Sequence, residues 1–347
     1  MTKPPRTTLI ANPARRSVLK LSLAAASASI AGMPSIVRAQ RAKTLRFGSP
    51  VPVGSTYYKA QEVFAEEVAK LSGGKIKVEL YPSFQLGSIK DMLTNTQLGT
   101  QSIGMAVPAW FAGYAKPIDV FSMPFIVGSL DRLRAGLDGP FGQQMMALTE
   151  PAGFKIIGHW IMGPRQIVNN ARPIRKPEDL AGLKIRVITS PVFIETFKAL
   201  GANPVGLDAA EMYLALQQKT VDGVDNAAVD LVNLKLFEVS KYLSLTSHIT
   251  DFFIVAMNKG LWDSFSAEEQ GMFNAAMKKS MDWEWSTQPD AIKAATDKLR
   301  TVMQSNEITA AERDAFVKAT RPVYQQFEAS IGRNVIEQAT KTLGLAG

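Results

Sequence analysis

The chain has 347 residues, of which 46% are hydrophobic and 20% are charged. This composition is typical of a folded globular protein and excludes a disordered chain, a collagen and a polytopic membrane protein. There is no cysteine, and the only histidines are His159 and His248. Disulfides, thiolate nucleophiles and zinc–cysteine sites are therefore excluded, and histidine catalysis has little support. At this length two globular lobes are favoured over a single core.

The formal net charge of +8 is concentrated in the first 39 residues. This segment holds six of the 39 basic residues and no acidic residue, so 33 basic and 31 acidic residues remain and the rest of the chain carries +2. Proteins that bind nucleic acid carry a basic surplus on their folded part. That surplus is missing here, so we expect no nucleic-acid partner.

Residues 1–39 have the three-part order of a secretory signal peptide. A basic stretch ends at Arg15-Arg16, and residues 21–30 are rich in Leu, Ala and Ser. Val37 and Ala39 then occupy the small-residue positions that precede a cleavage site. The apolar part is shorter than the ~20 residues that span a bilayer. We therefore expect residues 1–39 to be a cleaved export signal.

The paired arginines of this leader resemble the twin-arginine export motif. Ala14 stands where that motif usually has Ser or Thr, so the general secretory route stays open. In either case we expect cleavage near Ala39-Gln40 and a periplasmic protein.

From residue 44 onward, short β-rich runs alternate with amphipathic helices. Apolar spacing predicts a helix over 57–71, and Ser88 is expected to begin another that Gly99 ends. Strands are expected at 45–47, 76–80, 103–107, 154–160, 184–188, 221–225 and 252–257. Other helix starts are marked by Ser190-Pro191 and by capping boxes at 208–211, 266–269 and 309–312. From about residue 267 the chain is expected to be nearly all helix, with Pro289 as the only interior breaker.

Strands that alternate with helices predict an α/β protein with mainly parallel sheets. No linker follows residue 40, so the chain is expected to cross between its lobes more than once and to form a hinge beside a ligand cleft. We expect residues 40–163 and about 252–291 to form the first lobe. Residues 164–251 and about 292–347 are expected to form the second.

No phosphate-binding or dinucleotide-binding motif occurs in the sequence. Gly73-Gly74-Lys75 lacks the earlier glycine of a P-loop, and no GxGxxG run follows a strand. We therefore expect no cofactor. Because cysteine is absent, the two histidines are far apart and the motifs contain no nucleophile–base pair, we also expect no metal and no catalytic residue.

Arg186 is the residue of greatest chemical interest. It lies inside the predicted strand 184–188, where a buried guanidinium is unfavourable unless an anion pairs with it. A second arginine, Arg165, follows the strand around Trp160. Two arginines at strand ends could clamp a carboxylate. The alternative is an internal salt bridge to Asp222 or Asp225.

The residues around both arginines resemble the solute-binding proteins of tripartite ATP-independent periplasmic (TRAP) transporters, the DctP-like family. The resemblance covers essentially the whole chain after the leader. It is carried by Gly163-Pro164-Arg165-Gln166 and the runs 182–187, 197–204, 211–217 and 221–226, with outlying matches at 85–87 and 124–125.

The resemblance implies a two-lobed type II periplasmic binding protein-like fold with a long C-terminal helix contacting both lobes. It implies a protein that captures an organic acid and delivers it to the membrane subunits of a TRAP transporter. We expect this protein to be a monomer. Arg186 would pair with the ligand carboxylate, Arg165 would add charge and orientation, and Asn226 would hydrogen-bond the ligand.

Further residues are expected around the ligand. Sialic-acid-binding members carry an acidic residue near Val107 and an aromatic residue near Ala209, and neither is kept here. With Trp110 these residues favour a smaller or less hydroxylated acid, aromatic or keto in type. The loop from Ser49 to Tyr57 and the segment from Val107 to Trp110 would close the other side. A periplasmic enzyme or a ligand sensor on the same scaffold remain alternatives.

Overall fold

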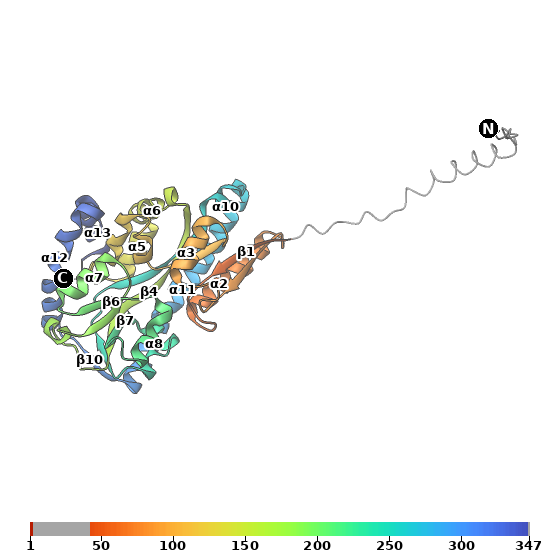
Figure 1. The fold of residues 1–347 in the computed structure, drawn as a ribbon. Coiled ribbons are helices and arrows are strands. Elements are labelled where there is room, and N and C mark those ends of the chain that lie inside the picture. The colour runs from red at the N-terminus through yellow and green to blue at the C-terminus, as the bar shows by residue number, and fades with distance from the viewer. Residues whose placement is uncertain (3–41, 346–347) are drawn as a thin grey trace. The chain divides into compact units, whose positions relative to one another are not determined.

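The computed structural model describes residues 1–2 and 42–345. The predicted leader and its cleavage site lie outside the described residues. Ala42–Gly347 form one compact unit, in which helices lie on both faces of a long, twisted sheet (Figure 1). Within the described residues, no helix combines the length and the apolar character needed to cross a bilayer.

The strands follow the seven predicted positions closely, and three strands that were not predicted, β6, β8 and β10, are added to them. They are β1 (Lys43–Gly48), β2 (Ile76–Tyr81), β3 (Ile103–Ala106), β4 (Phe154–Asn169), β5 (Lys184–Val187), β6 (Asn203–Gly206), β7 (Gly223–Ala227), β8 (Tyr242–Leu245), β9 (Thr250–Asn258) and β10 (Gln304–Glu307). Their order in the sheet is β2-β1-β3-β9-β4-β7-β5-β6, and β8 pairs with β4 and β10.

The helices begin largely where the capping residues predict. They are α2 (Thr56–Leu71), α3 (Ile89–Leu98), α4 (Pro108–Phe111), α5 (Leu130–Asp138), α6 (Pro140–Ala147), α7 (Pro191–Ala199), α8 (Met212–Gln217), α9 (Ala228–Asn233), α10 (Lys259–Asp263), α11 (Ala267–Val302), α12 (Ala310–Ile331) and α13 (Arg333–Leu343). Asp208, Ser266 and Thr309 each form the expected capping box, and Ser88, predicted only to begin a helix, forms one with Asp91 as well. Ser190 begins α7 without a side-chain cap, because its hydroxyl donates to Asp119 instead.

The sheet is mixed, not mainly parallel, because of β4 and β9. The N-terminal part of β4 pairs antiparallel with β9, and its C-terminal part pairs antiparallel with β7 and β8. β9 also pairs antiparallel with β3, whereas β1–β2 and β5–β6 are parallel. β4 therefore belongs to two half-sheets: a first one of β2, β1, β3 and β9, and a second one of β7, β5, β6, β8 and β10.

The bend between the half-sheets falls at a β-bulge in β4. The register with β9 shifts between Ile161 and Gly163, and Gly163 has φ +98°. An added Cβ there would lie 2.6 Å from the Cδ1 atom of Ile292, so both the backbone conformation and the helix α11 require glycine. The bulge coincides with the predicted lobe boundary at 163/164.

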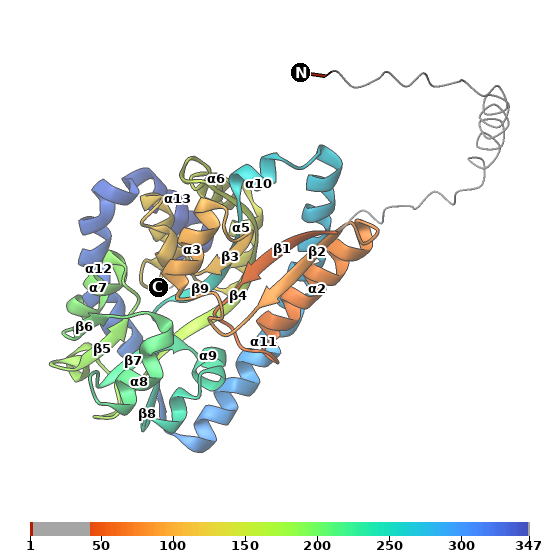
Figure 2. The same ribbon diagram turned by 45° about the vertical axis from the view of Figure 1, so that its right-hand side comes forward.

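Helix α11 contacts both half-sheets. It packs against α2 beside the first half-sheet and against α9 and β10 beside the second (Figure 2). A long helix in contact with both halves is thus confirmed. The expectation that Pro289 is the only breaker after residue 267 is wrong, because Pro322 lies inside α12.

The last two helices contact elements of both predicted lobes. α12 packs against α7, and α13 packs against α5 and α6. The assignment of residues 292–347 to the second lobe, like the rest of the lobe division, stays a prediction.

Candidate functional site

A cavity lies where the two half-sheets meet. The centres of water-sized molecules can occupy about 40 Å³ of it. It is lined from the first half by Pro50, Val51, Pro52, Phe84, Ile89, Val107, Trp110, Met162 and Phe253, and from the second half by Arg165, Arg186, Ile188, Ala209, Asn226, Asp230 and Leu234. The walls are thus mainly apolar, and the ionisable groups come from the second half.

Arg186 lies on the short strand β5 between β6 and β7, and only 1% of its surface is exposed. Its Nε and Nη2 atoms donate to the carbonyl oxygen of Leu207 at 3.0 and 2.6 Å. Within the described residues, no carboxylate oxygen lies within 4 Å of this guanidinium. Burial lowers the pKa of Arg186 to about 10. Arg186 is therefore a buried cation without an acidic partner of its own in this part of the chain.

The predicted alternative of an internal salt bridge is not what the structure shows for Arg186. Asp222 instead accepts a hydrogen bond from the backbone N–H of Lys184 at 2.8 Å. Asp225 instead pairs with Arg165. A guanidinium carries five N–H groups. Two of them donate to Leu207, so the N–H groups of Nη1 and one of Nη2 remain available to another acceptor.

Arg165, on β4, is neutralised within the protein. Its Nε lies 2.5 Å from Oδ2 of Asp225, its Nη1 lies 3.1 Å from Oδ2 of Asp251, and its Nη2 donates to the Asp225 carbonyl oxygen. Burial opposes its charge, but the two carboxylates outweigh burial and raise its pKa. Arg165 lines the cavity, yet its charge is already matched by two acids.

The acids around Arg165 differ in how firmly they are ionised. Burial favours the neutral form of Asp225, but Arg165 and His248 outweigh it and hold its pKa below the usual range. Asp251 contacts only Nη1 of Arg165. Burial outweighs this contact and raises the pKa of Asp251 to about 6. His248 is fully buried 3.5 Å from Asp225, and burial lowers its pKa.

Asn226 lies at the end of β7 and lines the same cavity. Its Oδ1 accepts a hydrogen bond from the N–H of Ala227 at 2.9 Å, and its Nδ2 lies 4.0 Å from the sulfur of Met212. The amide nitrogen thus has only a weak partner among the described residues. Its 4% exposure makes it a candidate donor to a bound oxygen.

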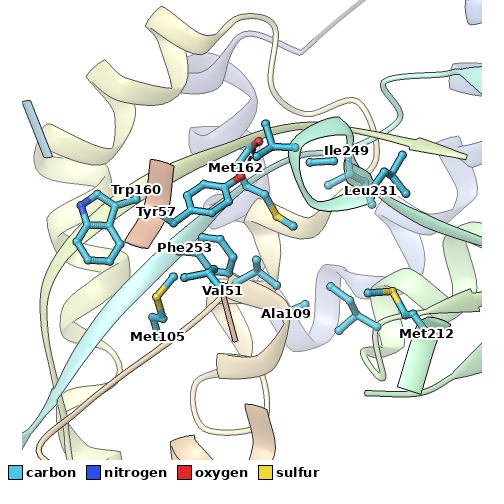
Figure 3. Packing of buried hydrophobic residues seen from close by; sticks show 14 of the residues in the cluster. Val51, Tyr57, Met105, Ala109, Trp160, Met162, Met212, Leu231, Ile249 and Phe253 are labelled. Carbon is cyan, nitrogen blue, oxygen red and sulfur yellow. Dashed lines mark hydrogen bonds between the residues drawn. The ribbon is translucent and has the colours of Figure 1, made fainter. Parts of the chain in front are cut away.

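The structure brings together every predicted site residue except Tyr57. Val107, Trp110 and Ala209 line the cavity with the three polar residues. Tyr57 is completely buried behind Phe253 and Met162, packing edge-to-face on Phe253 with its hydroxyl 3.5 Å from the Met162 carbonyl oxygen (Figure 3). Its place on the inner face of α2 makes it a support for the wall and not a lining residue.

The sequence analysis missed one charged residue of the cavity, Asp230. It interrupts an apolar run, Ala227-Ala228-Val229-Asp230-Leu231-Val232, directly after β7. An isolated acid in a buried apolar helix was the signal that could have identified it. Within the described residues, no group of three acidic or histidine side chains could hold a metal ion.

A sequence model of the bacterial extracellular solute-binding proteins, family 7, called DctP, matches residues 47–330. The chain belongs to this family. The 2,3-diketo-L-gulonate-binding periplasmic protein YiaO of Escherichia coli (strain K12) is 32% identical over 238 residues, which are 68% of this DctP-family chain and 73% of YiaO.

Solved structures of DctP-type proteins share the fold of this chain. The sugar acid binding protein DctPAm of Advenella mimigardefordensis, in complex with galactonate, has a TM-score of 0.85 and 28% identity over 88% of this chain and 99% of its own. A TRAP periplasmic solute-binding protein from Bordetella bronchispeptica, with density assigned to pantoate, has a TM-score of 0.83 and 29% identity over 86% and 99%. The expected two-lobed α/β fold with a long C-terminal helix is thereby confirmed.

Proposed function

We propose that the chain is an exported solute receptor that captures an organic acid in the cavity and delivers it to the membrane subunits of a TRAP transporter. The observation that carries this proposal is Arg186, a buried guanidinium in the cavity wall with no carboxylate of the described residues beside it. A buried cation of this kind is stabilised when an anionic ligand pairs with it. The relatives support this, since galactonate and pantoate are carboxylates.

In this function the three polar residues have different tasks. Leu207 fixes the Arg186 guanidinium through two hydrogen bonds, so its outer edge can take a carboxylate in bidentate fashion. Arg165 contributes positive potential while staying bound to Asp225 and Asp251. Asn226 donates to a second oxygen of the ligand, and Val107, Trp110 and Ala209 exclude water.

Ligand capture involves a change in the angle between the half-sheets. Among the described elements, β4, β9 and α11 connect the halves near the cavity, and the bulge at Gly163 is a point where β4 can bend. Binding that closes the cleft over a desolvated carboxylate gives slow ligand release. The protein works as a periplasmic monomer after removal of residues 1–39 and binds its ligand without converting it.

The experiment is the identification of a co-purified ligand. Freshly purified mature protein is denatured, released acids are identified by mass spectrometry, and each is added back in thermal melting and small-angle X-ray scattering. We expect an organic acid that raises the melting temperature, shrinks the radius of gyration and is recovered unchanged. At a hundredfold excess over Kd, stabilisation is about 2.7 kcal/mol. Conversion of the acid would favour an enzyme, and failure of a broad organic-acid panel would contradict the proposed function.

A further inference from the structure

Asp230 is a buried acid in the cavity wall. It lies on α9 and is 5% exposed, and its Oδ2 atom has no hydrogen-bond partner among the described residues. No basic side chain of the described residues lies within 4 Å of its carboxyl group. Its helix neighbours Ala228, Val229 and Leu231 are buried and apolar, so they offer the carboxyl group no polar side chain.

The charges around the cavity can accommodate one ligand carboxylate but not two. Arg165 is already matched by Asp225 and Asp251, so Arg186 is the cation left for the ligand among the lining residues. A second ligand carboxylate would face Asp230 with no cation to offset it. Like charges repel strongly where burial reduces screening by water.

A neutral hydroxyl group suits Asp230 in either of its protonation states. An ionised carboxylate accepts a hydrogen bond from the hydroxyl, and a protonated carboxyl group donates one to it. Burial raises the pKa of Asp230 to about 7, with Arg165 opposing this shift and Asp251 adding to it. α9 packs on β4, β7, α11 and residues 236–238, which carry Arg165, Asp225, Glu284 and Glu238 among their titratable groups. Burial raises the pKa of Glu284 well above normal. Burial also raises the pKa of Tyr57 on α2 well above normal, and Asp230 adds to that shift.

We propose that Asp230 is a specificity-determining residue: it hydrogen-bonds a hydroxyl group of the ligand and excludes a second carboxylate, so that the site selects hydroxylated monocarboxylates. The inference rests on the proposed function and narrows it. It replaces the sequence-based expectation of a less hydroxylated, aromatic or keto acid, which did not take Asp230 into account. Arg186 binds the ligand carboxylate, and Asp230 hydrogen-bonds a hydroxyl group elsewhere on the same ligand. The carbon chain of the ligand, between its carboxylate and its hydroxyl group, would contact the apolar walls of the cavity, which exclude water.

The test uses acids that share a carbon chain and differ in one terminal group. Butanoate, 4-hydroxybutanoate and succinate end in a methyl, a hydroxyl and a carboxylate group, and pentanoate, 5-hydroxypentanoate and glutarate repeat the series with one more carbon. Affinities are measured by calorimetry at pH 8 for the wild type, Asp230→Asn and Asp230→Leu. In the wild type we expect one hydroxy acid to bind about tenfold more tightly than its methyl and dicarboxylate counterparts, as a hydrogen bond to a charged group does.

The two variants separate hydrogen bonding from charge. Asp230→Asn keeps a hydrogen-bonding group but removes the charge, so the dicarboxylate should gain about tenfold while the hydroxyl preference remains. Asp230→Leu should reduce the hydroxyl preference to within about threefold. Asp119→Asn is the matched control, because Asp119 is also buried, with a pKa of about 7, but is bonded to Ser190 and does not line the cavity. It should leave all ratios unchanged.

Lower pH provides a second measurement that a purely structural role would not affect. As Asp230 takes up a proton between pH 8 and pH 6.5, where the dicarboxylates stay doubly ionised, the wild type should discriminate less against the dicarboxylate, and Asp230→Asn should show no such change. Circular dichroism confirms folding of each variant. Equal affinities for hydroxy acid and dicarboxylate, with ratios unaffected by Asp230→Asn, would overturn the inference and leave the proposed function standing. Absence of binding by all six acids would also overturn it, while the co-purified ligand decides the proposed function separately.

Discussion

Two buried arginines of the same cavity have different partners. Arg165 is bound by Asp225 and Asp251, which are 60 and 86 residues away in the sequence. Arg186 contacts only the carbonyl oxygen of Leu207 through its hydrogen bonds within the described residues. Removing each arginine should therefore have a different effect: Arg186 mainly on binding, Arg165 mainly on folding.

Arg186→Ala should abolish or severely weaken ligand binding while the protein stays folded. Loss of one partner of a buried charge pair costs about 2–5 kcal/mol, which is roughly 30-fold or more in affinity. Arg186→Lys should restore little, because an ammonium group cannot form the planar bidentate contact. Calorimetry with the identified acid measures both. Binding of Arg186→Ala within threefold of the wild type would make Arg186 a structural residue.

Arg165→Ala should destabilise the protein even without ligand. It leaves Asp225 and Asp251 buried beside each other without their cation, and breaking a buried pair in this way costs about 3–5 kcal/mol. Urea denaturation of the ligand-free protein measures this loss, with Arg186→Ala as the comparison. A free energy of unfolding equal to that of the wild type would contradict the pairing.

At the scale of elements, α11 is joined to both α2 and β4 by buried polar side chains. Ser280 and Glu284 follow each other at helical spacing. The Ser280 hydroxyl donates to the carbonyl oxygen of Ala60 on α2 at 2.6 Å, and Glu284 accepts from the N–H of Ile161 at the β4 bulge at 3.0 Å. The register of β4 shifts directly after Ile161, so the helix holds the strand at the point where its regular pairing is interrupted.

Replacement of Glu284 should distinguish its hydrogen bond from its charge. Burial raises the pKa of Glu284 well above normal, which favours its neutral form. Glu284→Gln keeps an acceptor for Ile161 and should change the free energy of unfolding by less than about 1 kcal/mol. Glu284→Leu leaves the Ile161 N–H unpaired and should cost about 1–3 kcal/mol. Equal effects of the two substitutions in urea denaturation would argue against this hydrogen bond.

At the scale of the whole molecule, buried acids make stability depend on pH. Burial raises the pKa values of Asp119 and Asp230 to about 7 and that of Asp251 to about 6. In the unfolded chain an aspartate loses its proton near pH 4. Between pH 4 and pH 7 the folded protein therefore binds more protons than the unfolded chain, and its stability falls as the pH rises.

We expect the free energy of unfolding of the ligand-free mature protein to be at least about 2 kcal/mol lower at pH 8 than at pH 5. Asp119→Asn and Asp230→Asn should each reduce this difference, because the amide has no proton to lose. Urea denaturation at the two pH values provides the measurement. Stability that increased from pH 5 to pH 8 would show that these acids are ionised in the folded protein.

Export should shorten the chain to a nearly neutral protein that begins at Gln40. The reason is the basic leader with Val37 and Ala39 before the expected cleavage site. Intact-mass measurement of periplasmic protein checks this, and replacing Arg15-Arg16 with Lys-Lys tests for twin-arginine export. A periplasmic mass that still included Met1–Ala39 would contradict the prediction.

Several features were determined by the sequence alone, because they depend on neighbouring residues. The capping boxes at Asp208, Ser266 and Thr309 formed as predicted, since a cap and its partner are three residues apart. Most strands occurred at the predicted positions because side-chain alternation is a local property. The sequence also placed Arg186 in a buried strand, which identified it as the main candidate for ligand binding.

Other features were decided only by the tertiary structure, because they depend on residues far apart in the chain. The extension of β4 to Asn169 and its antiparallel pairing made the sheet mixed. Packing against Phe253 placed Tyr57 behind the wall, and the meeting of the half-sheets brought Asp230 to the cavity. The pairing of Arg165 with Asp225 and Asp251 left Arg186 unmatched, because β4, β7 and β9 bring those three residues together only after the chain has folded.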